Sequence, residues 1–287
     1  MSGIATISGG TTPTNYSSTA GGSPTSNSSF SSFFPAGGNF TAVAGSGAAN
    51  VSGPAVYTSS NSAVTVSGAS ALNDNSAGNN SITAGSSMAV FTQAGDTVSA
   101  SSGSVTLFGA NSGQTKFSLS GSNSSIIGGN GSIAGTSSGA NSTLIGGQGV
   151  SLFNVTGSNS YIVGGSAGTT GVDLRGSTGP EQIFTNPGAD HGNMVVFMGS
   201  GADSFTGGGG NSTVVAGSGS DVFSFIKGHA GGTETIIGFN AKDNVAFGGY
   251  GYSLNNAPSE QVVNGSDVMT LSDGTKITFV GLDHKIF

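Results

Sequence analysis

Apolar residues recur along the middle of the chain at a nearly constant interval, with short polar and glycine-rich stretches between them. A nine-residue segment that begins at Gly121 returns in closely related form at Gly139 and at Gly157, which is an interval of 18 residues. Large apolar residues also follow a half-interval of nine; they are Phe108, Phe117, Ile126, Leu144, Phe153 and Ile162, with Leu72 and Val90 upstream. This period predicts a coil of two short strands and two tight turns that repeats along an axis.

Residues 18 apart would lie one above the other in neighbouring coils of such a solenoid. Glycine would supply the positive φ angles that tight turns need. Ser99, Gly135 and Gly171 stand where the half-interval skips an apolar residue. The apolar residues expected to form one buried column are Ile126, Leu144 and Ile162. The residues expected to form a ladder of amide hydrogen bonds are Asn123, Asn141 and Asn159.

The composition excludes several classes of protein. Of the 287 residues 53 are Gly, only 7% are charged, and Cys and Trp are absent. Scarce charge is not typical of disorder, seven Pro without a three-residue Gly period exclude collagen, and the net charge of −7 argues against a nucleic-acid partner. No apolar run is long enough for membrane insertion. Because Gly, Ser, Thr and Asn form helices poorly, the sequence predicts an all-β parallel β-solenoid or β-roll with about 18 residues per coil.

Three consecutive nonapeptides that begin at Met198, Gly207 and Ala216 approach the pattern G-G-x-G-x-D-x-U-x, where U is a large apolar residue. The apolar position holds Phe205, Val214 and Phe223, and the acidic position holds Asp203, Ser212 and Asp221. This pattern resembles the RTX repeats of bacterial proteins exported by type I secretion, which fold as a parallel β-roll. Glu181 takes the acidic position of a degenerate repeat upstream.

The resemblance implies one or two Ca²⁺ ions between these C-terminal turns, held by hard oxygen ligands. The residues that match the family's calcium ligands are Gly199, Gly201, Asp203, Gly217, Gly219 and Asp221. The alternative is that both aspartates are solvated turn residues. The upstream coils carry no acid in this position, where they have Ile133, Ser142, Ser151, Ser160 and Thr169. We therefore expect no calcium there, and strand pairing and small-residue stacking to hold those coils.

The C-terminal segment is similar to the segment that closes the β-roll of serralysin-type RTX proteins. Its pattern runs from Asp221 through Gly231-Gly232 to Val245. Asp273-Gly274 predicts the turn of a terminal β-hairpin, because alternating apolar residues flank it. The resemblance further implies an uncleaved secretion signal at the end of the chain, for which Leu282 to Phe287 is the candidate.

Four segments follow from these patterns. They are an N-terminal Ser/Thr/Gly-rich arm (1–60), a calcium-independent solenoid (61–175), RTX-like repeats (176–225), and a C-terminal cap with the secretion signal (226–287). The arm carries a cluster of phenylalanines, namely Phe30, Phe33, Phe34 and Phe40. Such a cluster needs burial, either on the first coil of its own chain or on a neighbouring subunit.

Catalytic motifs are missing from the sequence. It contains no H-E-x-x-H zinc motif, no Cys nucleophile and no G-x-S-x-G elbow. Asp74, Asp96 and Lys116 appear too far apart in register to cooperate, and Asp190-His191 is interpreted as a turn insertion. We therefore expect a protein that is not an enzyme and that needs no cofactor besides Ca²⁺.

The functional prediction is a secreted structural protein that assembles into an extracellular filament, matrix or surface layer. Copies of the chain would join head to tail through the phenylalanine arm. Cell-surface or matrix polysaccharide is a further candidate partner. Residues 1–6 are neither basic nor strongly apolar, so we expect export without a cleaved N-terminal signal. The alternatives are an adhesin, or a carbohydrate- or ice-binding module that acts as a monomer, and an accessory domain of an enzyme.

Overall fold

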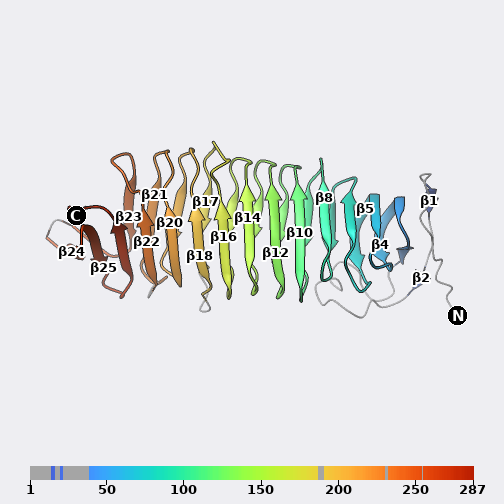
Figure 1. The fold of residues 1–287 in the computed structure, drawn as a ribbon, viewed down its shortest axis with the longest axis horizontal. Helices are drawn as coiled ribbons and strands as arrows, with labels where there is room; N and C mark the ends of the chain where they lie inside the picture. The colour runs from blue at the N-terminus through green and yellow to red at the C-terminus, as the bar shows by residue number, and fades with distance from the viewer. Residues whose placement is uncertain (1–13, 17–19, 22–38, 187–190, 230–231, 254) are drawn as a thin grey trace. The chain divides into compact units, whose positions relative to one another are not determined.

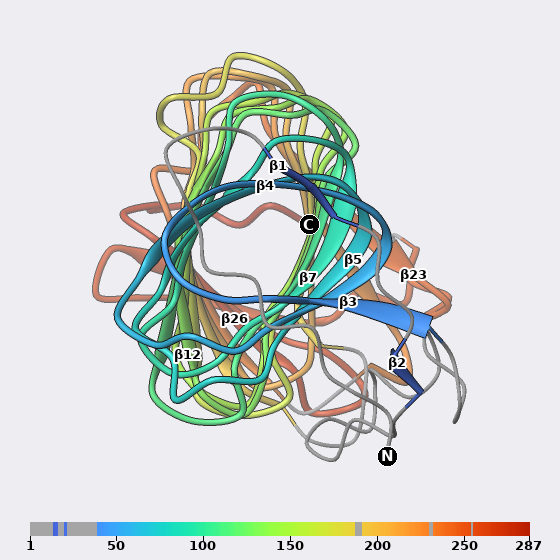
Figure 2. The same cartoon turned by 90° about the vertical axis from the view of Figure 1, so that its right-hand side faces the viewer.

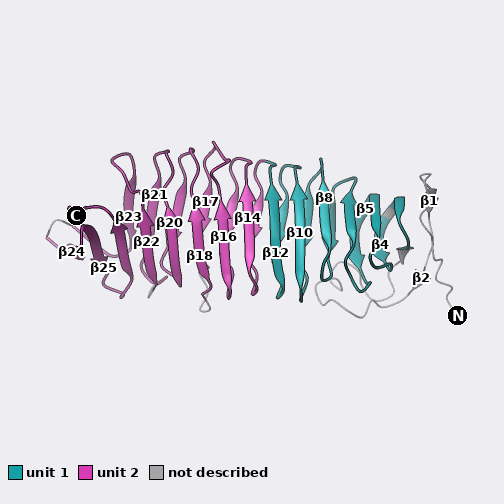
Figure 3. Cartoon of the chain, in the orientation of Figure 1, with its two compact units in different colours: residues 1–139 teal, residues 140–287 magenta. Residues whose placement is uncertain are grey.

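A computed structural model describes residues 14–16, 20–21, 39–186, 191–229, 232–253 and 255–287 (Figure 1). Every regular element within these ranges is a β-strand, and none of the described residues forms a helix that could span a membrane. The chain divides into two compact units, residues 1–139 and residues 140–287 (Figure 3). Each unit is built as a parallel β-solenoid.

Unit 1 stacks its coils through parallel strand pairs. Its strands are β1 (Thr14–Tyr16), β2 (Ala20–Gly21), β3 (Asn39–Val43), β4 (Gly47–Tyr57), β5 (Ala63–Asp74), β6 (Ser81–Ala84), β7 (Met88–Phe91), β8 (Thr97–Ala100), β9 (Val105–Phe108), β10 (Gln114–Leu119), β11 (Ser125–Ile127) and β12 (Ser132–Ser137). One ladder runs β5–β6–β8–β10–β12 and the other runs β5–β7–β9–β11. Seen end-on, β4 and β5 curve around the interior of the coil (Figure 2).

Unit 2 contains two parallel sheets. The first sheet is formed by β13 (Thr143–Ile145), β15 (Tyr161–Val163), β17 (Gln182–Phe184), β19 (Ser204–Gly207), β21 (Val222–Ile226) and β23 (Asn244–Gly248). The second sheet is formed by β14 (Ser151–Val155), β16 (Thr169–Asp173), β18 (Asn193–Phe197), β20 (Asn211–Val215), β22 (Thr233–Ile237) and β26 (Lys276–Val280). The antiparallel strands β25 (Ser266–Thr270) and β24 (Ser259–Val263) extend the second sheet. The predicted solenoid and its terminal hairpin are therefore confirmed.

Apolar columns fill the interior of each unit. In unit 2, Leu144 lies opposite Ile162 and Ile162 lies opposite Ile183, and all three side chains are fully buried. In unit 1, Ile126 lies opposite Leu107 and is also fully buried. Each such side chain contributes roughly 1.5–3 kcal/mol of hydrophobic free energy, so the columns are the main cohesive term of the fold.

The coil length is less regular than the sequence period suggests. The interval between paired core residues is 16 from Ile82 to Val98 and 24 from Val172 to Val196. Turns of different length absorb these differences. As a result Val98, and not Ser99, lies opposite Phe117.

The same drift moves two other predicted positions. Val172, and not Gly171, lies opposite Phe153, and Thr170 rather than Thr169 lies opposite Ser151. A fixed interval of 18 cannot detect this, because one additional residue in a turn shifts every later position by one.

The three recurring asparagines are turn residues. Asn123, Asn141 and Asn159 have φ angles of 57° to 58° and exposed side chains. Asparagine tolerates this left-handed conformation better than other non-glycine residues. The recurrence of Asn therefore reflects the backbone of the turn, and not the amide ladder that the period suggested.

Close stacking of the turns explains much of the glycine content. A Cβ atom on Gly121 would lie 1.5 Å from the carbonyl oxygen of Gly103, and one on Gly139 would lie 2.2 Å from that of Gly121. Contacts this short are excluded by van der Waals repulsion. Glycine is thus required at these two positions, where one turn lies directly on the next.

Removing a column residue should destabilise the protein strongly. We expect Leu144→Ala to lower the free energy of unfolding by about 2–5 kcal/mol, because it leaves a cavity in a packed column. Denaturant unfolding followed by circular dichroism measures the change. Leu152→Ala, at an exposed position of β14, is the control and should change stability by no more than about 0.5 kcal/mol. Equal effects of the two substitutions would contradict the assignment of the column.

Candidate functional site

The acidic residues of the C-terminal repeats form an inward-facing column in unit 2. Glu181, Asp203, Asp221 and Asp243 each stand one residue before a strand of the first sheet, at β17, β19, β21 and β23. All four side chains are buried. In the strand that follows each acid, side chains point alternately outward and inward, and the first residue of the strand faces outward. The acid, one residue earlier, therefore points into the corner of the coil.

One carboxylate oxygen of each residue links its coil to the preceding coil. The Ser160 N–H donates to Glu181 Oε2 at 2.5 Å, and the Glu181 N–H donates to Asp203 Oδ1 at 2.9 Å. The Asp203 N–H donates to Asp221 Oδ1 at 3.1 Å, and the Asp221 N–H donates to Asp243 Oδ1 at 3.0 Å. The column is therefore a continuous ladder of hydrogen bonds from backbone N–H groups to carboxyl oxygens.

For the three aspartates, the second carboxylate oxygen closes the residue's own turn. The Gly199 N–H donates to Asp203 Oδ2 and the Gly217 N–H donates to Asp221 Oδ2, both at 3.0 Å. The Asn240 N–H completes the series with Asp243 Oδ2 at 2.9 Å. Each aspartate thus accepts hydrogen bonds from two backbone N–H groups that strand pairing leaves without an acceptor.

Hydroxyl groups accept turn N–H groups in the same way at a second corner of unit 2, where the strands of the second sheet begin. The Gly147 N–H donates to Ser151 Oγ at 3.1 Å, and the Gly165 N–H donates to Thr170 Oγ1 at 2.9 Å. Both hydroxyl-bearing side chains are buried. A neutral residue can therefore also close a turn. The N–H groups of the turns are accepted either by a hydroxyl oxygen or, in the C-terminal repeats, by a carboxyl oxygen.

Burial raises the pKa of several acids in this unit. It raises the pKa of Asp203 and of Asp221 above the ordinary value, and that of Glu181 to about 7. Glu234 in β22 is fully buried; its Oε1 accepts the Gly208 N–H at 2.7 Å, its Oε2 has no hydrogen-bond partner, and burial raises its pKa to about 8. Among the described residues no Lys or Arg forms an ion pair with the column.

Two of the glycines matched to calcium ligands stand where the close stacking of turns leaves no room for a side chain. A Cβ on Gly217 would lie 1.8 Å from the Gly199 carbonyl oxygen, and one on Gly219 would lie 1.7 Å from that of Gly201. The structure brings Asp203 and Asp221 together on adjacent coils, as their spacing predicted, with carboxylates directed at N–H donors. Within the described ranges no three His, Cys, Asp or Glu side chains are grouped to hold a metal. Calcium binding stays a prediction.

Sequence reasoning missed an acidic pair in unit 1. Asp74 and Asp96 appeared distant in register, but Asn80 joins them: its Nδ2 donates to Asp74 Oδ2 at 2.6 Å and its backbone N–H donates to Asp96 Oδ1 at 2.9 Å. Burial and a hydrogen bond with Asp74 raise the pKa of Asp96 to about 7. Both acids are fully shielded from solvent, which favours a role in the turn. The interval of 22 residues between Asp74 and Asp96 does not match the 18-residue period, so the sequence pattern did not indicate this contact.

Three of the predicted assembly residues, Phe30, Phe33 and Phe34, lie outside the described residues. Phe40 lies in β3, where its backbone pairs with Ala20 of β2. His191 is exposed and its Nδ1 lies 3.2 Å from the Asn186 carbonyl oxygen, while Asp190 is not described. His191 borders a cavity of about 620 Å³. The other polar side chains that line this cavity are Gln148, Ser166, Thr169 and Asn193.

The final residues of the chain pack against the cap. The ring of Phe287 lies 6.2 Å from that of Phe247 and 6.2 Å from that of Tyr252. The Ile286 N–H donates to Glu260 Oε1 at 2.7 Å. The segment proposed as a secretion signal is therefore part of a packed surface, and its role in export stays a prediction.

The stability of unit 2 should fall between pH 5 and pH 9. The folded pKa values of Glu181 and Glu234, about 7 and about 8, exceed the ordinary 4.5, so folding tightens proton binding. This stabilisation is complete below about pH 4.5 and is lost as the pH rises through the folded pKa. We expect Glu234→Gln to reduce the fall by at least ~1.4 kcal/mol, the equivalent of one pKa unit. Urea unfolding at pH 5, 7 and 9 measures it, and an unchanged pH dependence in Glu234→Gln would refute the burial argument.

A methyl group in the stacked turns should be poorly tolerated. We expect Gly219→Ala to lower the free energy of unfolding by more than 1 kcal/mol, because its Cβ would lie 1.7 Å from a backbone oxygen. Gly248→Ala is the matched control, since its nearest neighbour would be 3.6 Å away. Thermal unfolding of the two variants checks this, and similar melting temperatures would show that the turns can separate at little cost.

Comparisons with known proteins add no relative to this picture. No family model, no curated protein and no solved structure matches the chain. The resemblance to RTX repeats therefore depends on the residues of the repeats alone, and the fold and the hydrogen-bonded column are what the structure contributes.

Proposed function

We propose that this chain is a secreted, non-enzymatic structural protein that assembles with copies of itself into an extracellular filament, matrix or surface layer. The observation that carries the proposal is a row of apolar side chains on the outer face of the second sheet of unit 2. Phe197, Val215, Ile237 and Val280 lie opposite one another on four adjacent strands. Three of them, Phe197, Ile237 and Val280, are 36%, 38% and 41% exposed.

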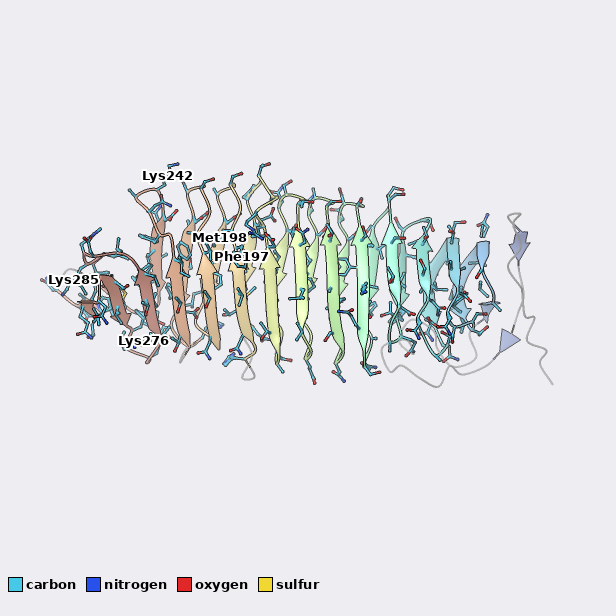
Figure 4. All side chains as sticks on the ribbon, in the orientation of Figure 1. Phe197, Met198, Lys242, Lys276 and Lys285 are labelled. Carbon is cyan, nitrogen blue, oxygen red and sulfur yellow. The ribbon has the colours of Figure 1, made fainter. Side chains whose placement is uncertain are left out.

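Such a row favours association because its burial against another molecule removes apolar surface from water. The neighbouring outward positions Thr213, Thr235 and Thr278 are uncharged. Charge lies at one end of the row, where Asp173 is opposite Phe197 and the Arg175 guanidinium carbon lies 4.9 Å from the centre of the Phe197 ring. Figure 4 marks Phe197 at the end of its strand, next to the buried Met198. The neighbouring subunit would supply apolar groups of its own, for which the N-terminal residues Phe30 to Phe40 are the proposed source.

Calcium belongs to the proposal as a regulator of the C-terminal repeats. Asp203 and Asp221 place two carboxylates on adjacent coils, and Ca²⁺ prefers carboxylate and carbonyl oxygens. The carboxylates in this structure accept N–H groups, so ion binding requires the turns to present carbonyl oxygens in their place. A bound Ca²⁺ would neutralise the carboxylates of Asp203 and Asp221. The stacked glycine-rich turns would hold these carboxylates in place.

Self-association is tested with the full chain and two variants. We expect light scattering and negative-stain electron microscopy to show polymers of the wild type. Ile237→Ser/Val280→Ser should shift the protein to monomers, because the row loses its apolar surface. Ile226→Ser, at an exposed position of the first sheet, should still assemble. A wild type that stays monomeric at high concentration, with or without Ca²⁺, would overturn the proposed function.

Calcium binding is tested separately by calorimetry. We expect the wild type to bind Ca²⁺ at millimolar concentration or below, and chelation to lower the melting temperature of the folded chain. Asp203→Asn/Asp221→Asn should abolish the binding, while Asp173→Asn, at an exposed ion pair with Arg175, should leave it unchanged. Absence of binding by the wild type would remove calcium from the proposal without affecting self-association.

A further inference from the structure

The outer face of the first sheet of unit 2 carries no charge on its two central rows. One row consists of Thr143, Tyr161, Gln182, Ser204, Val222 and Asn244. The other consists of Ile145, Val163, Phe184, Thr206, Ser224 and Ala246. A surface of this kind offers neither attraction to a polyanion nor an ion pair to a charged protein, and it suits an uncharged partner.

Two aromatic rings interrupt these rows of mostly small or polar residues. Tyr161 is 42% exposed, and its ring centroid lies 4.8 Å from that of Phe184, with the ring planes inclined by 36°. Other exposed positions in the Tyr161 row are occupied by amides. Tyr161 is exposed and Phe184 is partly exposed. Such adjacent rings form a hydrophobic platform whose phenol hydroxyl can still bond to a polar ligand.

Hydrogen-bonding side chains flank the platform on both sides. Thr143 and Gln182 are the direct neighbours of Tyr161 on β13 and β17, at the strand spacing of about 4.8 Å. A hydroxyl and a primary amide each donate and accept hydrogen bonds. Gln182 is exposed and Thr143 partly exposed, so both can reach a ligand that lies on the sheet.

We propose that Tyr161 and Phe184, with Thr143 and Gln182, form a binding platform for a neutral polysaccharide chain. The C–H face of a sugar ring packs on an aromatic ring, and sugar hydroxyls exchange hydrogen bonds with amide and hydroxyl groups. The row direction follows the stacking of coils, so an extended glycan lies across several strands. This inference goes beyond self-assembly and does not depend on it, because the apolar row proposed for assembly lies on the other sheet.

A solely structural role for the aromatic pair makes a different prediction. In that case the rings only stabilise the contact between β15 and β17, as cross-strand pairs do. Substitutions at Tyr161 would then alter the melting temperature and leave glycan binding unaffected. The experiment therefore measures both properties on the same variants.

Affinity gel electrophoresis of the full chain provides the test, with neutral hydroxyethyl cellulose, laminarin or dextran cast in the gel. We expect at least one neutral glucan to retard the wild type. Tyr161→Phe should keep at least half of the retardation, because the ring remains. Tyr161→Leu should lose at least 80% of it while remaining folded by circular dichroism. Leu152→Ala, at an exposed apolar position of the other sheet outside the assembly row, should behave as the wild type.

Carboxymethyl cellulose provides the charge control. It shares the glucan backbone of hydroxyethyl cellulose, but the wild type should migrate through it with little retardation because the platform offers no cation. No retardation by any neutral glucan would overturn the proposal, as would equal retardation of the wild type and Tyr161→Leu. If Tyr161→Leu instead lost self-association in light scattering and kept its glucan retardation, the surface would be a contact between copies of the chain.

Discussion

The close stacking of one turn on the next is the constraint on which this fold depends. Parallel coils bring the backbone of each turn so near to its neighbour that a Cβ on Gly219 would lie 1.7 Å from a carbonyl oxygen. The turn must therefore be built without side chains at these points, and its N–H groups must still find acceptors. Glycine meets the first demand, and a buried carboxylate or hydroxyl at the corner meets the second.

This view connects the low charge of the chain with the unusual placement of its few acids. A carboxylate inside a corner costs desolvation, and the raised pKa of Glu181 records that cost. Two N–H donors for each aspartate offset part of it. Where Ser151 or Thr170 closes the turn instead, the cost is smaller and the pH dependence disappears. The acids of the C-terminal repeats therefore add responsiveness to protons, and in the proposed function to calcium, at some expense of stability.

The sequence was sufficient to predict the coil, the parallel sheets and the terminal hairpin, because a period in apolar residues is a direct trace of core packing. It predicted that Leu144 and Ile162 share a column, and they do. It could not locate the register change at Val98, since one residue added to a turn leaves the local pattern intact. It also missed the contact between Asp74, Asn80 and Asp96, because that contact depends on how three turns close in space. The calcium ligands and the phenylalanine arm depend on binding partners, for which backbone periodicity carries no information.

The ladder of carboxylates also has a direction. Each acid reaches the N–H group of the coil before it, from Asp243 to Asp221 and onward to Ser160, and Asp243 also accepts hydrogen bonds within its own turn, from the N–H and side-chain amide of Asn240. A chain that emerges N-terminus first therefore exposes, at every step, a corner whose acceptor has not yet appeared. Completion of unit 2 waits for its last coil, so that the ladder couples the maturation of earlier turns to the arrival of the C-terminal end.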